Sequence, residues 1–284
     1  MIAEKFNKLK NDASDWLDIW QSVADEFTIM PIAINKDASV RKTLSRNILD
    51  NTALVSINAM VAGLQTGITT VSKKWFKFDI GQTITSNSRK ISKFEDFVDK
   101  VISNSNFYSV VSELYRDIVL YGNACCLVRD DDNELFRLER LQIGSYFIDY
   151  NHYGQAVHLV RKIRIKSKEA KELFKSIDAP EHTKIDIYHS IEQGKKGAWV
   201  SKYEYDGKTI EEYKYDYKPF LFVSWSTERG DDYSLSPAMN ALGDVRQLQT
   251  EQMRKAMAID YQTDPPVQIP VSMRNNEIDR KSVV

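Results

Sequence analysis

The chain has 284 residues, of which 42% are hydrophobic and 28% charged, and its formal net charge is −1. These values are typical of a globular protein with one large domain or two of ordinary size. No stretch approaches 18 uninterrupted apolar residues, and the N-terminus lacks the layout of a signal peptide, so no membrane association is expected. A sequence-specific DNA-binding protein is disfavoured, because such proteins carry a basic excess. The near-zero net charge is compatible with a surface past which DNA slides.

The cysteine content indicates a reducing compartment. The only two cysteines, Cys125 and Cys126, are adjacent in the chain, a geometry that seldom forms a disulfide. We expect both to be small apolar core residues.

The first 122 residues predict a helical part. Apolar residues at steps of three and four predict an amphipathic helix over 3–27, followed by an extended segment at 30–32 and a basic link at 41–46. A second helix is expected over 51–67, with Ala62 and Gly63 as a surface for close packing. Residues 75–80 alternate as a short strand or extended arm. Two further helices are expected over 89–103 and 107–121, the second ending at Gly122.

From residue 123 the hydrophobic period changes to that of strands. Strands are predicted over 125–129, 135–140, 145–150, 156–166, 185–191, 198–205, 209–217 and 219–225. Asp206-Gly207 predicts a tight hairpin turn, and a short helix over 167–174 is expected to be capped by Ser167. This part, 123–225, is expected to be a mostly antiparallel sheet region.

The last part, 226–284, begins with a polar loop that leads into a long helix. Ser236 is a good N-cap and Pro237 suits the first helical position, so a helix is expected from 237 to about 261, stopped by Asp264-Pro265-Pro266. The tail, 275–284, is polar. Helices, a sheet region and a long helix together predict an α+β protein with parts 1–122, 123–225 and 226–284.

The long helix is the candidate oligomer or channel element. Its apolar stripe is incomplete and is surrounded by glutamines and balanced charges. We expect one side to contact a neighbouring subunit and the other to face a wet channel or a partner; an ordinary surface helix is the alternative. The candidate residues are Leu242, Val245, Arg246, Leu248, Gln249 and Gln252. Aspartate at Leu242 or Val245 is expected to abolish assembly of the subunits and leave the rest folded.

Several segments, in order along the chain, resemble the head-to-tail connector (portal) proteins of short-tailed phages. The block 225–242 carries a W…G…Y…SP…AL pattern, with Trp225, Ser236 and Pro237 among its residues. The family has a Trp-Phe pair that resembles Trp75-Phe76, and its pattern nFy…fGtA resembles residues 106–124. The family also has a proline pair that closes the long helix, and Pro265-Pro266 resembles that pair.

The resemblance implies a structural subunit: a portal wing of helices and sheet attached to a stem-like helix. It implies a ring of about twelve copies at the capsid vertex, around a channel for non-specific passage of double-stranded DNA. The implied partners are major capsid and scaffolding proteins, terminase and a tail adaptor. The implied location is the virion, and the host cytoplasm during assembly. Family members are usually longer, so the chain is expected to be an N-terminal fragment.

Two surface features are candidate contacts with DNA or another protein. Lys162, Arg164 and Lys166 alternate on one strand face and could touch DNA or a partner, although a solvated strand face is the alternative. Five tyrosines could stack bases, although cross-strand aromatic packing is commoner: Tyr203, Tyr205, Tyr213, Tyr215 and Tyr217.

No catalytic, cofactor-binding or metal-binding residue is predicted. The four histidines lack metal-ligand spacing, and phosphate-loop and serine-elbow motifs are absent. An acidic hairpin turn is the better interpretation of 130–134, but a metal-dependent phage nuclease or hydrolase remains an alternative. It would use Asp130, Asp132, Glu134 and Glu139. A second alternative is a monomeric virion adaptor that binds through the tyrosine hairpin.

Overall fold

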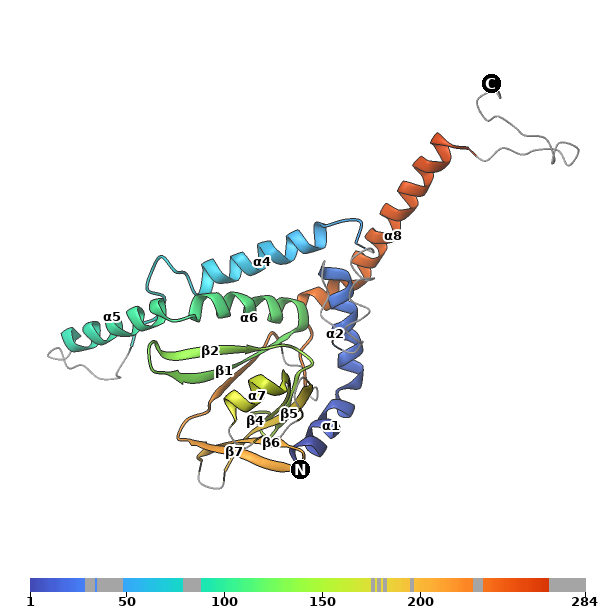
Figure 1. Cartoon of the computed structure of the whole chain (residues 1–284). Coiled ribbons are helices and arrows are strands. Elements are labelled where there is room, and N and C mark those ends of the chain that lie inside the picture. The colour runs from blue at the N-terminus through green and yellow to red at the C-terminus, as the bar shows by residue number, and fades with distance from the viewer. Residues whose placement is uncertain are drawn as a thin grey trace, which may run out of the picture.

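The structure is a computed structural model that describes residues 1–28, 34, 48–78, 88–174, 177, 180, 183–194, 197–226 and 232–265. Helices lie above and beside two antiparallel sheets, and the last helix projects away from this body (Figure 1). The α+β prediction is therefore confirmed. Across the described part of the chain, every helix is too short or too polar to cross a bilayer.

The N-terminal part folds as helices close to the predicted ranges. They are α1 (Ile2–Asp12), α2 (Ser14–Phe27), α4 (Thr52–Ile68), α5 (Ser88–Asn104) and α6 (Phe107–Tyr121). The prediction of one continuous helix over 3–27 is wrong, because the helix breaks at Ala13 (φ −95°, ψ 16°). The break lets α1 pack on the sheet, where the ring of Phe6 lies 5.2 Å from that of Phe147, while α2 packs on α6 and on the last helix, α8 (Pro237–Thr263).

One other detail of the helical part differs from the expectation, and the structure decides between the two alternatives for the start of segment 75–80. A side chain added at Gly63 would meet nothing within 4 Å, so Gly63 provides no close-packing surface. Residues 74–78 form an arm that belongs to no strand. The ring of Trp75 stacks on the ring of Phe107, with 5.8 Å between the ring centroids, and this contact holds the arm. The segments predicted at 30–32, 41–46, 79–80 and 275–284, most of the loop at 226–231, and Pro266 lie outside the described residues.

The strands form two sheets in the described part of the chain. The order β2-β1-β8 joins β1 (Asn123–Asp131), β2 (Leu135–Leu141) and β8 (Phe220–Ser224). The order β3-β4-β5-β6-β7 joins β3 (Tyr146–Tyr150), β4 (Ala156–Lys166), β5 (Lys184–Gln193), β6 (Trp199–Tyr205) and β7 (Lys208–Tyr215). All pairs are antiparallel, as expected.

Local turn and cap predictions are mostly confirmed. Asp206 and Gly207 both have positive φ, as the tight hairpin between β6 and β7 requires. The short helix α7 (Ser167–Leu173) begins after Lys166 and has no side-chain cap, so the prediction that Ser167 caps it is wrong. Ser167 is instead the first helical residue.

One continuous core joins α1, α2, α4, α6 and α8 to both sheets. It contains Trp20 from α2, Ile57 from α4, Cys125 from β1, Phe147 from β3 and Val245 from α8 (Pro237–Thr263). The core therefore draws on all three predicted parts of the chain. Both cysteines are free and fully buried, as predicted.

The C-terminal end of α6 is where these parts meet. Gly122 ends the helix in the left-handed conformation (φ 76°), and its N–H donates to the Ile118 carbonyl at 2.9 Å. The Trp20 ring N–H donates to the Tyr121 carbonyl at 3.1 Å, and the Ser236 hydroxyl donates to the Leu120 carbonyl at 2.8 Å. Helix ends leave such carbonyls unpaired, so these side chains satisfy groups that would otherwise be buried without partners.

Replacing Gly122 tests how closely the chain is packed at this junction. A Cβ at Gly122 would lie 2.0 Å from the Ser234 carbonyl oxygen, whereas at Gly154, also at positive φ, it would meet nothing within 4 Å. Gly154→Ala should therefore lower the free energy of unfolding by about 1–2 kcal/mol, the cost of the backbone conformation alone. Gly122→Ala should cost about 3 kcal/mol or more, measured by urea denaturation. Equal losses in the two variants would contradict the close approach.

Candidate functional site

The inner half of α8 is built into the body of the protein. The Ser236 hydroxyl accepts the Met239 N–H at 3.0 Å and Pro237 is the first helical residue, which confirms the predicted start of the helix. α8 packs against α2 and α6, and its buried residues include Val245 and Gln249. The first turns of α8 therefore have a fixed direction relative to the core.

Gln249 anchors α8 to the segment that precedes α4. Its side-chain oxygen accepts the N–H groups of Leu49 and Asp50 at 2.8 and 3.0 Å, and its side-chain nitrogen donates to the Asp50 carbonyl at 2.8 Å. Gln249 is only 8% exposed. Because the buried side-chain amide and the backbone groups that it bonds all have hydrogen-bond partners, they stabilise one arrangement of α4 and α8.

The remaining candidate residues of α8 lie at different depths. Leu242 and Leu248 are half-buried, and Gln252 donates to the Asp50 carboxylate at 3.4 Å. Arg246 is exposed and pairs with Glu26 of α2 at 3.3 Å. Val245 packs in the core, so aspartate there would disturb the fold as well as any subunit contact. Their role in oligomer contacts stays a prediction.

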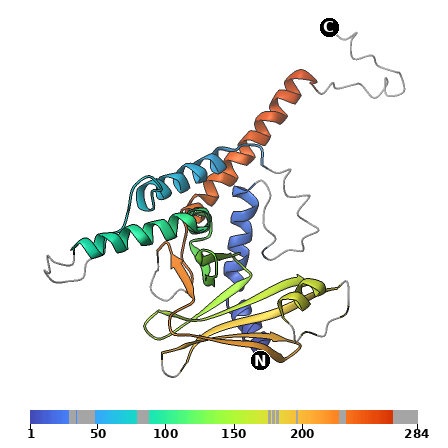
Figure 2. The same cartoon turned by 60° about the vertical axis from the view of Figure 1, so that its left-hand side comes forward.

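The outer half of α8 projects away from the body. In Figures 1 and 2 it extends beyond α2 and α4, and every residue from 253 to 265 is exposed. Four of its large apolar side chains are about half-exposed: Met253 (50%), Met257 (45%), Ile259 (51%) and Tyr261 (65%). Such a group of exposed apolar side chains is typical of an interaction surface.

A groove lies between the inner half of α8 and α4. It has a volume of about 280 Å³ and is mainly apolar, lined by Phe27, Ala53, Ser56, Ile57, Met60, Ala241, Asp244, Val245 and Leu248, with Thr52, Pro237 and Ala238. Sites for small molecules usually measure about 300–1,000 Å³, so this groove lies at the lower end of that range and has room for a few side chains. Val245 and Leu248 of the predicted set lie in its wall.

The basic strand face is largely neutralised within the chain. Lys162 and Arg164 both pair with Asp186 of the neighbouring strand β5, at 2.7 and 2.9 Å. Among the described residues Lys166 has no ion-pair partner. Two of the three predicted cations are thus already occupied, which favours a structural role for this face.

The four carboxylates of the nuclease alternative do not gather into one metal site, and two of them, Asp130 and Glu139, already have partners. The Asp131 carboxylate accepts the N–H groups of Asn133 and Glu134, as in an acidic hairpin turn, and Asp130 accepts from the Tyr217 hydroxyl at 3.0 Å. Glu139 lies further along β2 and pairs with two arginines. In the described part of the chain, His, Cys, Asp and Glu side chains form no group that could hold a metal ion.

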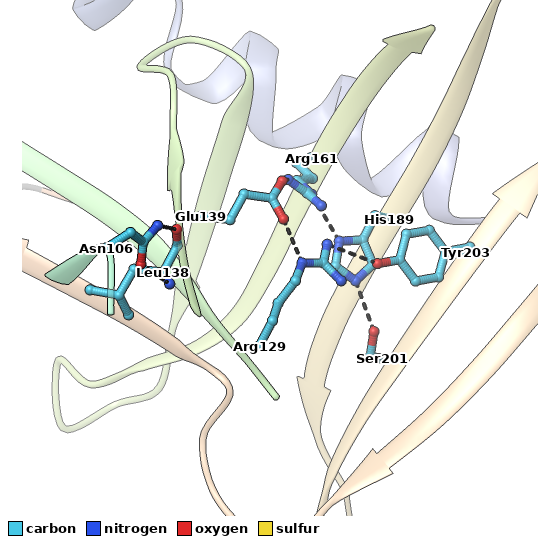
Figure 3. Close-up of polar contacts among 8 residues, drawn as sticks. All are labelled: Asn106, Arg129, Leu138, Glu139, Arg161, His189, Ser201 and Tyr203. Atoms are coloured by element: carbon cyan, nitrogen blue, oxygen red, sulfur yellow. Dashed lines mark hydrogen bonds and ion pairs between the residues drawn. The ribbon is translucent and has the colours of Figure 1, made fainter. Parts of the chain in front are cut away.

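Glu139 belongs to a polar cluster that joins the two sheets (Figure 3). It accepts from Arg129 at 2.5 Å and from Arg161 at 2.6 Å, and Arg161 also donates to the Nδ1 atom of His189 at 2.9 Å. Burial alone raises the pKa of Glu139, but the Arg161 and Arg129 guanidiniums outweigh it and hold the pKa below its ordinary value. Asn106, beside the cluster, bonds both backbone groups of Leu138 and ties α6 to β2.

The geometry fixes His189 as a neutral ring. Since Nδ1 accepts from Arg161, Nε2 carries the proton and donates to the Ser201 hydroxyl at 2.8 Å. Burial and the Arg161 guanidinium hold the pKa of His189 well below its usual range. In a catalytic triad a carboxylate would stabilise the charged histidine, and here an arginine opposes it. Ser201 is also buried (2% exposed), so this serine and histidine are structural.

The tyrosine hairpin forms one wall of a cleft of about 920 Å³ between the sheets. Tyr203 is buried and stacks on His189 at 4.1 Å, which leaves it unavailable to a base. Tyr213 and Tyr217 donate to the Glu211 and Asp130 carboxylates, charges that repel nucleic acid. The arrangement favours cross-strand packing over base stacking.

The chain belongs to the bacteriophage head to tail connecting protein family, whose model matches residues 1–282. This confirms the resemblance based on the ordered segments. The chain is 28% identical to the "Probable portal protein" of Bordetella phage BPP-1, over 98% of this chain and 56% of that relative. It is 24% identical to the "Portal protein" of Salmonella phage epsilon15, over 98% of this chain and 55% of that relative. The chain thus spans about half the length of these relatives.

The anchor at Gln249 can be tested against a glutamine two positions earlier. Gln249→Ala leaves the Leu49 and Asp50 backbone groups without their partner and should lower the free energy of unfolding by about 1–3 kcal/mol. Gln247 is exposed and, among the described residues, its side chain bonds Glu251 alone. Gln247→Ala should therefore change the free energy of unfolding by less than about 0.5 kcal/mol. Urea denaturation measures both, and an unchanged stability of Gln249→Ala would contradict the anchor.

The buried neutral histidine predicts a pH dependence of stability. The pKa of His189 is depressed in the folded state, so its contribution is complete above the unfolded pKa of about 6.5 and is lost as pH falls below it. Between pH 7.5 and 5.5 the loss of unfolding free energy should be smaller in His189→Gln than in the unmodified protein, by about 1 kcal/mol. The exposed His152 provides the control, and His152→Gln should retain the original pH dependence.

Proposed function

We propose that this chain is part of a portal subunit that assembles into a ring at the capsid vertex. Family membership is the observation that carries the proposal, and the two curated relatives are named as portal proteins. The role is structural: the ring joins head to tail and provides the opening through which double-stranded DNA enters and leaves. The proposed partners are the capsid, scaffolding and terminase proteins and a tail adaptor.

The three parts of the chain receive roles in this proposal. Residues 1–122 and 123–225 are assigned to the wing, and 226–284 to the loop, α8 and the beginning of a stem. The support for the last assignment is that α8 has 27 residues and leaves the body with its outer half exposed. A closed ring is proposed because a head-to-tail contact repeated by rotation can close into a cyclic assembly, and the number of about twelve copies is the one that the family resemblance implies.

The charge of the chain fits the passage of DNA without tight binding. Each phosphate contact adds affinity, so a basic channel would slow the movement of DNA, whereas the net charge here is −1. Asp186 neutralises Lys162 and Arg164 within the chain. We propose no catalytic role, and the support is that the Ser201–His189 pair is buried and faces an arginine.

Electron microscopy of purified protein tests the proposal. Both the 284-residue chain and its complete reading frame would be imaged by negative stain, with native mass spectrometry to count subunits. Rings of about a dozen subunits with a central hole are expected in at least the complete form. Monomers in both forms would contradict the ring and favour the monomeric adaptor.

A further inference from the structure

α8 presents two apolar features on opposite sides. Met253, Met257 and Tyr261 follow one another at steps of four and form a stripe along the exposed outer half. At about 100° per residue, Ala241 and Leu248 of the groove lie about 160–180° around the helix from Met257. One helix therefore carries a projecting stripe on one side and a receptor on the other.

We propose that the stripe of one copy sits in the α4–α8 groove of the next copy in the ring. This rests on the ring proposed above and names its contact. A surface that fits a different surface of an identical copy makes a heterologous contact, the kind that a ring repeats. The volume of about 280 Å³ admits side chains, and methionine is the residue that best adapts to an irregular apolar space.

The charges beside the two features are complementary. Asp244 lines the groove and is exposed, while Arg254 adjoins Met253 on the outer half and is also exposed. Among the described residues neither Asp244 nor Arg254 has an ion-pair partner within the chain. Seating the stripe in the groove of a second copy brings opposite charges together at its edge and favours this orientation over the reverse.

Cysteine cross-linking tests the contact directly. Ser56 lines the groove and is exposed, and Ser56→Cys exchanges only an oxygen for a sulfur. Combined with Met257→Cys and oxidised with copper phenanthroline, it should link each copy to the next and give a ladder of covalent multimers on a non-reducing gel. The native Cys125 and Cys126 are fully buried, so they leave the background clean.

A control pair of cysteines shows whether cross-linking depends on this contact or only on two copies lying near each other. Lys255 is exposed on the same half of α8 but lies about 160° around the helix from Met257. Ser56→Cys with Lys255→Cys should therefore give at least about tenfold less multimer, because only neighbouring thiols reach a high effective concentration. Each cysteine alone should give no ladder.

The outcomes distinguish the contact from the ring. Rings with a ladder specific to the Ser56–Met257 pair support the contact. Rings with no ladder, or with equal ladders for both pairs, overturn the contact and leave the proposed function standing. Monomers in the microscope, in the complete form as well, overturn the ring and this contact with it.

Discussion

The fold depends on how the carbonyl groups at the C-terminal end of α6 are satisfied. A helix cannot pair its own last carbonyls, and this end lies inside the core. The partners come from distant parts of the chain: Trp20 of α2, Ser236 at the start of α8, and the Trp225 N–H, which donates to the Gly122 carbonyl at 2.8 Å. Gly122 adopts the left-handed conformation that makes room for them. The hydrogen bond that satisfies Leu120 also fixes where α8 begins.

Local chemistry made much of the fold predictable. Gly122, Asp206-Gly207 and Ser236-Pro237 each need only their own neighbours to define a stop, a turn or a start. The break at Ala13 was not predictable in this way, because alanine is the best helix former. Contacts of α1 with the sheet and of α2 with α6 and α8 decide it instead. Likewise, a glycine in a helix suggests close packing, but the sequence does not show what surrounds Gly63. In the structure a side chain added there would meet open space.

The site was predictable at the level of one helix and much less at the level of its residues. The pattern that selected α8 cannot tell which side contacts the chain's own core, and Val245 and Gln249 proved to lie there. Gln249 bonds backbone groups 199 and 200 residues away in the chain, a pairing with no local signal. The Arg161–His189–Ser201 contacts depend on the register of three adjacent strands, and Glu139 comes from the other sheet. No spacing in the sequence indicates these contacts.

The exposed outer half of α8 has a consequence for assembly energetics. A short helical segment that lies wholly in water sits close to the midpoint of its helix–coil equilibrium, because propagation gains little over the entropy of ordering each residue. In a separate subunit we therefore expect residues 253–263 to fray more readily than the anchored half, and the proposed contact would hold them helical where a neighbour covers them. Association through the proposed contact would then include a folding step, whose entropic cost would weaken the first contact between two copies. Closure of the proposed ring would cover every outer half at once, so isolated pairs would be disfavoured relative to complete rings.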